Sequence, residues 1–240
     1  LSSLPDDIEL HILPFLDETK SFVRFSAVSK QWKAHLAEPY GKIIEFATSR
    51  FVNNLTVNFK YVLGFNGLLR NGLACPSLKT LRLNRCSLGN TFSFPTVTSM
   101  HLENCCLDRI DLLLACPNLK ELCLVDTVFD LLGEKNLKAG PKLVRLSVEY
   151  KRPSKWGITK ISAPGLEYFS FVVDHSVEIE YFPAVDDFPS LQCAVIDAAH
   201  PTGRFDLIEI IKFLRGLHNT EYLSLSPTLI QSVNHLPSLD

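Results

Sequence analysis

The sequence predicts an α/β chain in which a short helical unit precedes a solenoid of stacked repeats that carries a parallel sheet. Two observations support this prediction. Apolar residues recur at helical spacing in the first forty or so residues, and an apolar triplet recurs from Val52 onward at intervals of about 20 to 29 residues. A chain of 240 residues is long enough to hold one small domain followed by such an array.

The first helix of the N-terminal unit is predicted to begin at Pro5. Proline suits the first helical position, and the two aspartates that follow it complement the positive end of the helix dipole. Ile8, Ile12 and Phe15 then recur at spacings of four and three, which places them on one apolar face. This face needs a covering surface.

Two further short helices are expected to complete this unit. One carries Phe22, Val23 and Ala27, and the next presents Trp32 and Leu36 four residues apart. A three-helix unit of this size buries little surface, so it needs a partner or an attached domain to be stable.

The order Leu-Pro-Asp-Asp-Ile, Ile-Leu-x-Phe-Leu and Val-Ser-Lys-x-Trp across residues 4–32 resembles the F-box motif. The resemblance implies that this unit docks on a Skp-type adaptor and, through it, on a cullin. The alternative is a helical cap that only seals the end of the array. By the resemblance, the adaptor contacts fall on Leu4, Pro5, Ile8, Ile12, Leu16, Val28, Ser29, Lys30 and Trp32.

The repeat consists of an apolar residue, two variable residues, a second apolar residue, one variable residue and a third apolar residue. This pattern and its period are typical of leucine-rich repeats, although a single α/β domain with parallel strands is the alternative. The triplets are Val52/Leu55/Val57, Leu78/Leu81/Leu83, Val97/Met100/Leu102, Leu119/Leu122/Leu124, Leu143/Leu146/Val148, Leu166/Phe169/Phe171, Leu191/Ala194/Ile196 and Thr220/Leu223/Leu225, with Leu239 opening a possible ninth.

Leucine-rich repeats also carry Asn or Cys three residues after the third member of the triplet, where the side chain bonds the backbone between neighbouring turns. Cys86 and Cys105 occupy this position, and Thr127 and Thr228 are expected to substitute for them. The remaining repeats hold unsuited residues here, so the sequence predicts an irregular solenoid. Those residues are Lys60, Lys151, Asp174 and Ala199.

Each triplet is expected to contain a short strand, and the strands together form a parallel sheet on the concave face. Since side chains alternate along a strand, the residues between and beside the inward leucines must point outward. We expect these outward residues to bind a protein client, with loops at the end of the array as the alternative. The predicted client-binding residues are Arg82, Asn84, His101, Glu103, Glu121, Arg145, Glu149 and Tyr168.

The predicted domain organisation is an F-box at residues 1–38, a linker and capping helix at 39–51, and about eight repeats at 52–240. Residues 205–217 carry apolar residues at helical spacing, with Asp206 as a cap, and should pack in the outer layer.

Several classes of function lack support in the sequence. The net charge of −2 and the absence of a basic run argue against nucleic acid, and no apolar stretch is long enough for a membrane span. No metal-binding motif occurs, and Arg82 and Arg145 are too few basic residues for a polyphosphate, so no cofactor is expected. His101 and Cys123 form the one weak nucleophile–base candidate.

The segment Cys-Pro-x-Leu-Lys-x-Leu occurs at Cys75 and again at Cys116. With the F-box residues, it resembles the large plant family of F-box proteins with leucine-rich repeats. The resemblance implies a non-catalytic substrate-recognition subunit of a Skp–cullin–F-box ubiquitin ligase; the alternative is a leucine-rich-repeat interaction scaffold without a ligase role. Seven cysteines without a paired motif suggest reduced thiols, and therefore the cytoplasm or nucleus.

Overall fold

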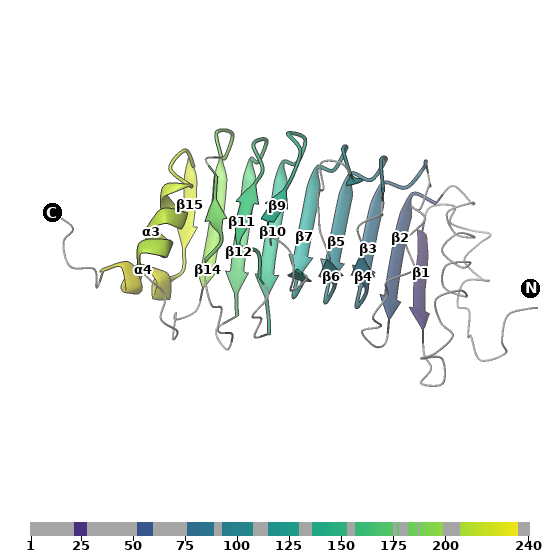
Figure 1. Cartoon of the computed structure of the whole chain (residues 1–240), viewed down its shortest axis with the longest axis horizontal. Coiled ribbons are helices and arrows are strands. Elements are labelled where there is room, and N and C mark those ends of the chain that lie inside the picture. The colour runs from purple at the N-terminus through teal and green to yellow at the C-terminus, as the bar shows by residue number, and fades with distance from the viewer. Residues whose placement is uncertain are drawn as a thin grey trace, which may run out of the picture.

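The chain forms a parallel β-solenoid with few helices (Figure 1). The computed structural model describes the backbone of residues 22–27 and residues 52–59, 76–88, 93–107, 115–129, 136–152, 157–174, 177, 182–186, 188–198 and 207–234. The residues predicted to contact an adaptor all lie outside these ranges, as do the expected capping helix at 42–51 and Asp206.

One wall of the solenoid is a nine-stranded parallel sheet with the order β1-β2-β3-β5-β7-β10-β12-β14-β15. Each repeat adds one strand at the edge, so strand order follows chain order (Figure 1). The strands are β1 (Phe22–Ala27), β2 (Asn54–Phe59), β3 (Thr80–Asn84), β5 (Ser99–Glu103), β7 (Glu121–Val125), β10 (Arg145–Tyr150), β12 (Tyr168–Val173), β14 (Cys193–Ala198) and β15 (Tyr222–Leu225).

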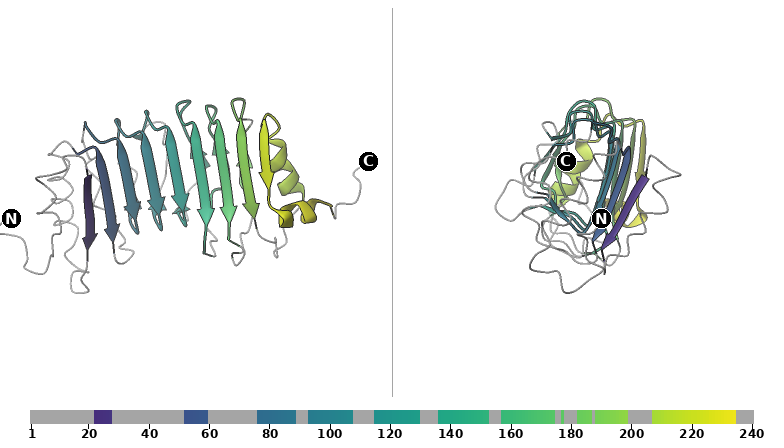
Figure 2. Two further views of the ribbon diagram at one scale, coloured as in Figure 1. Left: turned by 180° about the vertical axis from the view of Figure 1, so that it is seen from behind. Right: turned by 90° about the vertical axis from the view of Figure 1, so that its right-hand side faces the viewer.

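The wall across the core contains two small parallel sheets, which the sequence analysis did not predict. They have the orders β4-β6-β8 and β13-β11-β9, and the end-on view in Figure 2 shows the two walls enclosing the core. Buried residues such as Leu88, Leu107 and Phe129 lie in the first of these sheets. The strands are β4 (Ser87–Leu88), β6 (Cys106–Leu107), β8 (Val128–Phe129), β9 (Asn136–Lys138), β11 (Lys160–Ser162) and β13 (Ala184–Val185).

Two helices, α3 (Leu207–Arg215) and α4 (Pro227–Asn234), lie at the C-terminal end of the array (Figure 1). The helix expected within residues 205–217 is confirmed by α3, which buries Ile210 and Phe213 against the core. Phe213 packs against Phe169, Phe171 and Phe182, with ring centroids 5.2 to 6.1 Å apart.

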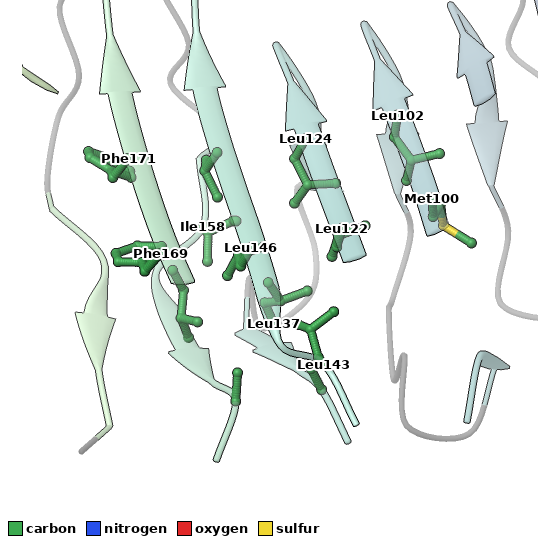
Figure 3. Packing of buried hydrophobic residues seen from close by; sticks show 14 of the residues in the cluster. Met100, Leu102, Leu122, Leu124, Leu137, Leu143, Leu146, Ile158, Phe169 and Phe171 are labelled. Carbon is green, nitrogen blue, oxygen red and sulfur yellow. The ribbon is translucent and has the colours of Figure 1, made fainter. Parts of the chain in front are cut away.

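The register of the large sheet confirms the alignment of the triplets. Leu81 on β3 pairs with Leu55 on one side and with Met100 on the other, and this in-register column continues to Leu223 on β15. Every member of the first seven triplets is buried, and Figure 3 shows several of these side chains on successive strands. Leu223 remains 44% exposed because β15 is the last strand of the sheet.

A second interior ladder joins neighbouring turns through polar side chains, at the positions predicted for it. The Cys105 thiol donates to the carbonyl of Leu83 at 3.5 Å, and its sulfur lies 3.5 Å from the sulfur of Cys86. Thr127 donates through Oγ1 to the carbonyl of Leu102 at 3.1 Å. Thr228 also bonds the preceding turn, at the carbonyl of Ala198 at 2.7 Å, which lies two residues beyond the third triplet residue Ile196.

The ladder is interrupted at Lys151, as expected. An acidic side chain from the previous turn provides the connection between turns at this position. Asp126 accepts hydrogen bonds from the backbone N–H of Lys151 at 2.7 Å and of Arg152 at 3.1 Å. It also accepts a bond from Nε of Arg152 at 3.1 Å. The Asp126 carboxylate therefore connects these two turns in place of the ladder residue.

The prediction of a helix carrying Phe22, Val23 and Ala27 is wrong, because residues 22–27 form strand β1. β1 pairs in parallel with β2, and its register places Val23 and Phe25 opposite Leu55 and Val57. Aromatic and β-branched residues in alternation favour a strand, and the edge of β2 offers it backbone partners. The three-helix form of the N-terminal unit is therefore not shown.

Leu122→Asp should destabilise the solenoid severely, because Leu122 is 2% exposed and lies between Met100 and Leu146 in the inner column. An unpaired buried charge costs about 3 to 5 kcal/mol. Urea unfolding followed by circular dichroism measures the loss, with Glu121→Gln, on the exposed neighbour, as the control. If Leu122→Asp unfolds at the same urea concentration as the parent, the inward placement is wrong.

Thr127→Val should lower the free energy of unfolding by about 1 kcal/mol, because it removes the hydroxyl that donates to the buried carbonyl of Leu102. Thr127→Ser keeps the hydroxyl and should lose less. Equal losses for these two variants, measured by thermal melting, would show that the ladder bond contributes nothing.

Candidate functional site

The outward side chains of the large sheet form one continuous and mostly polar face, here called the open face; it is the face expected from the sequence to be concave. Because the strands are in register, these side chains fall into rows that run across the strands. The middle row contains Thr56, Arg82, His101, Cys123, Ser147 and Ser170.

All eight residues predicted to bind a client lie on the open face, in β3, β5, β7, β10 and β12, and none of them is buried. The alternation inferred from the triplets is therefore confirmed, whereas the client-binding role stays a prediction. The eight are Arg82, Asn84, His101, Glu103, Glu121, Arg145, Glu149 and Tyr168.

Two adjoining hollows lie on the open face. One, of about 560 Å³, lies over β2, β3 and β5 and includes Asn84 and Glu103. The other, of about 450 Å³, extends to β12 and includes Arg145 and Tyr168. Arg82 and His101 line both hollows, so they join them into one depression.

Arg145 is held by an aromatic ring rather than by a carboxylate. Its guanidinium carbon lies 5.3 Å from the centroid of the Tyr168 ring on the adjacent strand. Glu121 is its register partner on the other side, yet the ion pairs among the described residues do not include Arg145, Glu121 or Arg82. The N–H donors of the Arg82 and Arg145 guanidinium groups are thus available to a ligand.

Glu149 differs from the other predicted residues, because it does not line either hollow. It forms an ion pair with Lys151, with 3.4 Å between Oε1 and Nζ, on the same strand and its continuation. Its carboxylate therefore lies beside the depression and already has a cation.

His101 and Cys123 are register partners on β5 and β7, but their electrostatics do not suit nucleophilic catalysis. Burial raises the pKa of the Cys123 thiol, and the nearby Glu149 raises it further. Burial lowers the pKa of His101, and Arg82 adds to that effect. The thiol is therefore kept protonated, whereas a nucleophilic cysteine needs a depressed pKa.

Several residues that line the hollows were not predicted from the sequence. Asn54, Thr56 and Asn58 point outward from β2, and Ser147 points outward from β10. The same alternation that identified Arg82 could have found them, since each flanks an inward member of a triplet.

Among the residues that the structure describes, no group of His, Cys, Asp or Glu could hold a metal ion. The six cysteines in these ranges are free thiols, and none of the described helices is long and apolar enough to cross a membrane.

His101 should titrate with a pKa below the usual value of about 6.5. Because the folded-state pKa of His101 is lowered, the residue costs no stability above about pH 6.5, its usual value in the unfolded chain. As the pH falls below that value toward the folded-state pKa, His101 progressively destabilises the fold. NMR titration of the imidazole checks this. Arg82→Gln should raise the pKa only in part, since burial is the larger cause; a pKa at or above 6.5 in the parent chain would contradict the burial of His101.

Comparisons with known proteins bear on the N-terminal residues. Residues 1–40 match the F-box-like family model, and this range contains all the residues predicted to contact an adaptor. The chain matches no curated protein. It matches no solved structure either. Residues 1–40 therefore carry an F-box-like domain, which supports the interpretation of this chain as an F-box protein.

Proposed function

We propose that this chain is the substrate-recognition subunit of a Skp–cullin–F-box type ubiquitin ligase. The observation that carries the proposal is the F-box-like match at residues 1–40 on a chain whose remainder is a solenoid with an open polar face. F-box domains typically bind Skp-type adaptors, and an exposed sheet of side chains suits the binding of a protein client.

In this proposal the chain performs no chemistry itself. The F-box docks on the adaptor and, through it, on the cullin, while the repeats bind the client. Holding both together raises the effective concentration of client lysines near the ubiquitin-charged enzyme. The proposal assigns residues 1–38 to the F-box, 39–51 to a linker and 52–240 to an irregular leucine-rich-repeat array of the plant type, acting in the cytoplasm or nucleus.

The irregularity and the ladder support the assignment to leucine-rich repeats. The Cys105 and Thr127 side chains bond backbone carbonyls of the preceding turn, which is the role of the Asn or Cys of that repeat. The outward positions then provide the client surface, with Arg82 and Arg145 as residue types that often dominate binding interfaces.

A scaffold without a ligase role is the second candidate, and one observation favours it. β1 pairs with β2 along its whole length, so residues 22–27 extend the solenoid as its first strand. An N-terminal segment that only caps the array would account for that pairing. Adaptor binding separates the two candidates, because a cap has no need of an adaptor.

The double variant Leu4→Ala/Pro5→Ala should reduce capture of a Skp-type adaptor, because central apolar anchors often contribute about 2 kcal/mol or more. Capture by the tagged full chain is measured by pull-down with purified adaptor. The control is Pro76→Ala/Pro117→Ala, which changes two exposed prolines in turns of the solenoid. Failure of the parent chain to capture the adaptor would favour the scaffold, and equal capture by parent and Leu4→Ala/Pro5→Ala would overturn the predicted adaptor contacts.

A further inference from the structure

The two arginines of the depression are separated by a fixed distance. Arg82 lies on β3 and Arg145 on β10, three strand steps apart in the sheet order. Arg145 also lies two residues before Ser147, the register equivalent of Arg82 on that strand. With about 4.8 Å between strands and about 3.3 Å per residue, their Cα atoms are separated by about 16 Å.

The floor between the two arginines is neutral and mostly small. His101, Cys123 and Ser147 occupy the middle row beyond Arg82, and Ser99 lines the same hollow. Burial lowers the pKa of the imidazole and raises that of the thiol, so both groups are uncharged near neutral pH. A ligand that follows this row meets hydrogen-bonding groups, and the fixed negative charge nearest to its path is that of Glu121 beside Arg145.

Two carboxylates line the depression and limit which anions can enter. Glu103 follows His101 on β5, and Glu121 is the register neighbour of Arg145 on β7. A polyanion with closely spaced charges would place some of them beside Glu103 or Glu121, where like charges repel. Two separate anionic groups, one at each arginine, reduce this repulsion, because no further anion lies between them and each is paired with a guanidinium group.

We propose that the depression binds an extended client segment with two anionic side chains four or five residues apart and small neutral residues between them. One anion pairs with Arg82 and the other with Arg145. This inference rests on the proposed function, since it names the kind of client that the repeats would recognise. The spacing follows from an extended chain, which advances about 3.3 to 3.6 Å per residue.

Tyr168 makes Arg145 the better preorganised of the two positions. The ring holds the guanidinium group over β12, on the side away from Arg82. A planar guanidinium whose rotamer is already restricted loses less freedom on binding a carboxylate or phosphate. The anion is a carboxylate of aspartate or glutamate or the phosphate of a phosphorylated residue, because each of these groups offers oxygens to the same donors.

Fluorescence anisotropy with labelled synthetic peptides tests the proposal on the full chain. One peptide carries two aspartates four residues apart in a Gly/Ser background, so that both lie on one face of an extended chain, and a second carries two phosphoserines at those positions. Two further peptides carry adjacent aspartates or two lysines. Both spaced anionic peptides, or one of them, should bind at least about tenfold tighter than the adjacent and lysine peptides, and the tighter of the two identifies the source of the anion.

Arg82→Gln and Arg145→Gln should each weaken binding of the preferred peptide by about tenfold. Lys138→Gln is the matched control, because Lys138 is exposed on β9, in a different sheet. Thermal melting checks that each variant remains folded, which is expected because both arginines are exposed. Undetectable binding of both spaced peptides, equal binding of all four, or unchanged binding by both arginine variants would overturn the proposal.

Adaptor capture, measured on the same preparations, separates this inference from the proposed function. Capture of the adaptor with no preference for spaced anions overturns the client rule and leaves the ligase role in place. Selective peptide binding without adaptor capture supports the client rule and overturns the ligase role.

Discussion

The structure depends on the in-register stacking of inward apolar side chains from one turn of the solenoid to the next. A single turn has too little surface to bury its own triplet, so each column residue is covered by its equivalents on both sides, as Leu122 is by Met100 and Leu146. A shift of one residue in any strand would exchange the inward and outward sets. The register is therefore strongly determined.

Backbone hydrogen bonds at the strand entrances follow the same repeat. The carbonyl of Lys79 accepts bonds from the N–H groups of Thr98 and Ser99, and the carbonyl of Thr98 accepts from the next turn in the same way. At the strand exits, Arg85, Asn104 and Asp126 take positive φ angles of 60°, 53° and 46°. These left-handed corners lead into β4, β6 and β8, and the described residues after β10 show no such corner.

Two small sheets, rather than one, line the second wall because their strands lie at different points of the turn. β4, β6 and β8 come directly after the left-handed corners, whereas β9, β11 and β13 begin 10 or 11 residues after the ends of β7, β10 and β12, and the turn after β7 supplies a strand to both sheets. The number of residues between successive triplets also increases in the later repeats. The longer turns have room for a strand farther from the large sheet's corner. The fold thus changes its outer wall while it keeps the inner columns continuous.

The inner columns could be predicted from sequence because a repeated pattern samples the same environment many times. One triplet such as Leu191/Ala194/Ile196 is ambiguous by itself, but eight in succession determine each other's register. The short strands of the second wall could not be predicted, since two-residue strands such as Val128–Phe129 leave no periodicity to detect. Strand β1 was missed for a related reason: Phe22, Val23 and Ala27 fit a helical spacing, whereas Val23, Phe25 and Ala27 fit an alternating one.

The open face was predictable in position but not in detail. Alternation placed Arg82 and Arg145 outward, because the inward leucines leave no other direction. It could not reveal that Arg145 stacks on Tyr168 instead of pairing with Glu121, since both neighbours are equally close in register. Side-chain choices of this kind depend on local packing rather than on a repeat.

A rigid array with an irregular surface is well suited to selecting among protein segments. The inner columns hold each strand in place, so outward side chains such as Arg82 and His101 keep their spacing whether or not a ligand is present. Little ordering of the receptor then opposes binding, and affinity depends on how well the client's charges match the fixed positions. Since charges of both signs lie within the same depression, a mismatch would bring like charges together as well as lose an attraction, and in the proposed role such repulsion would distinguish one client from another.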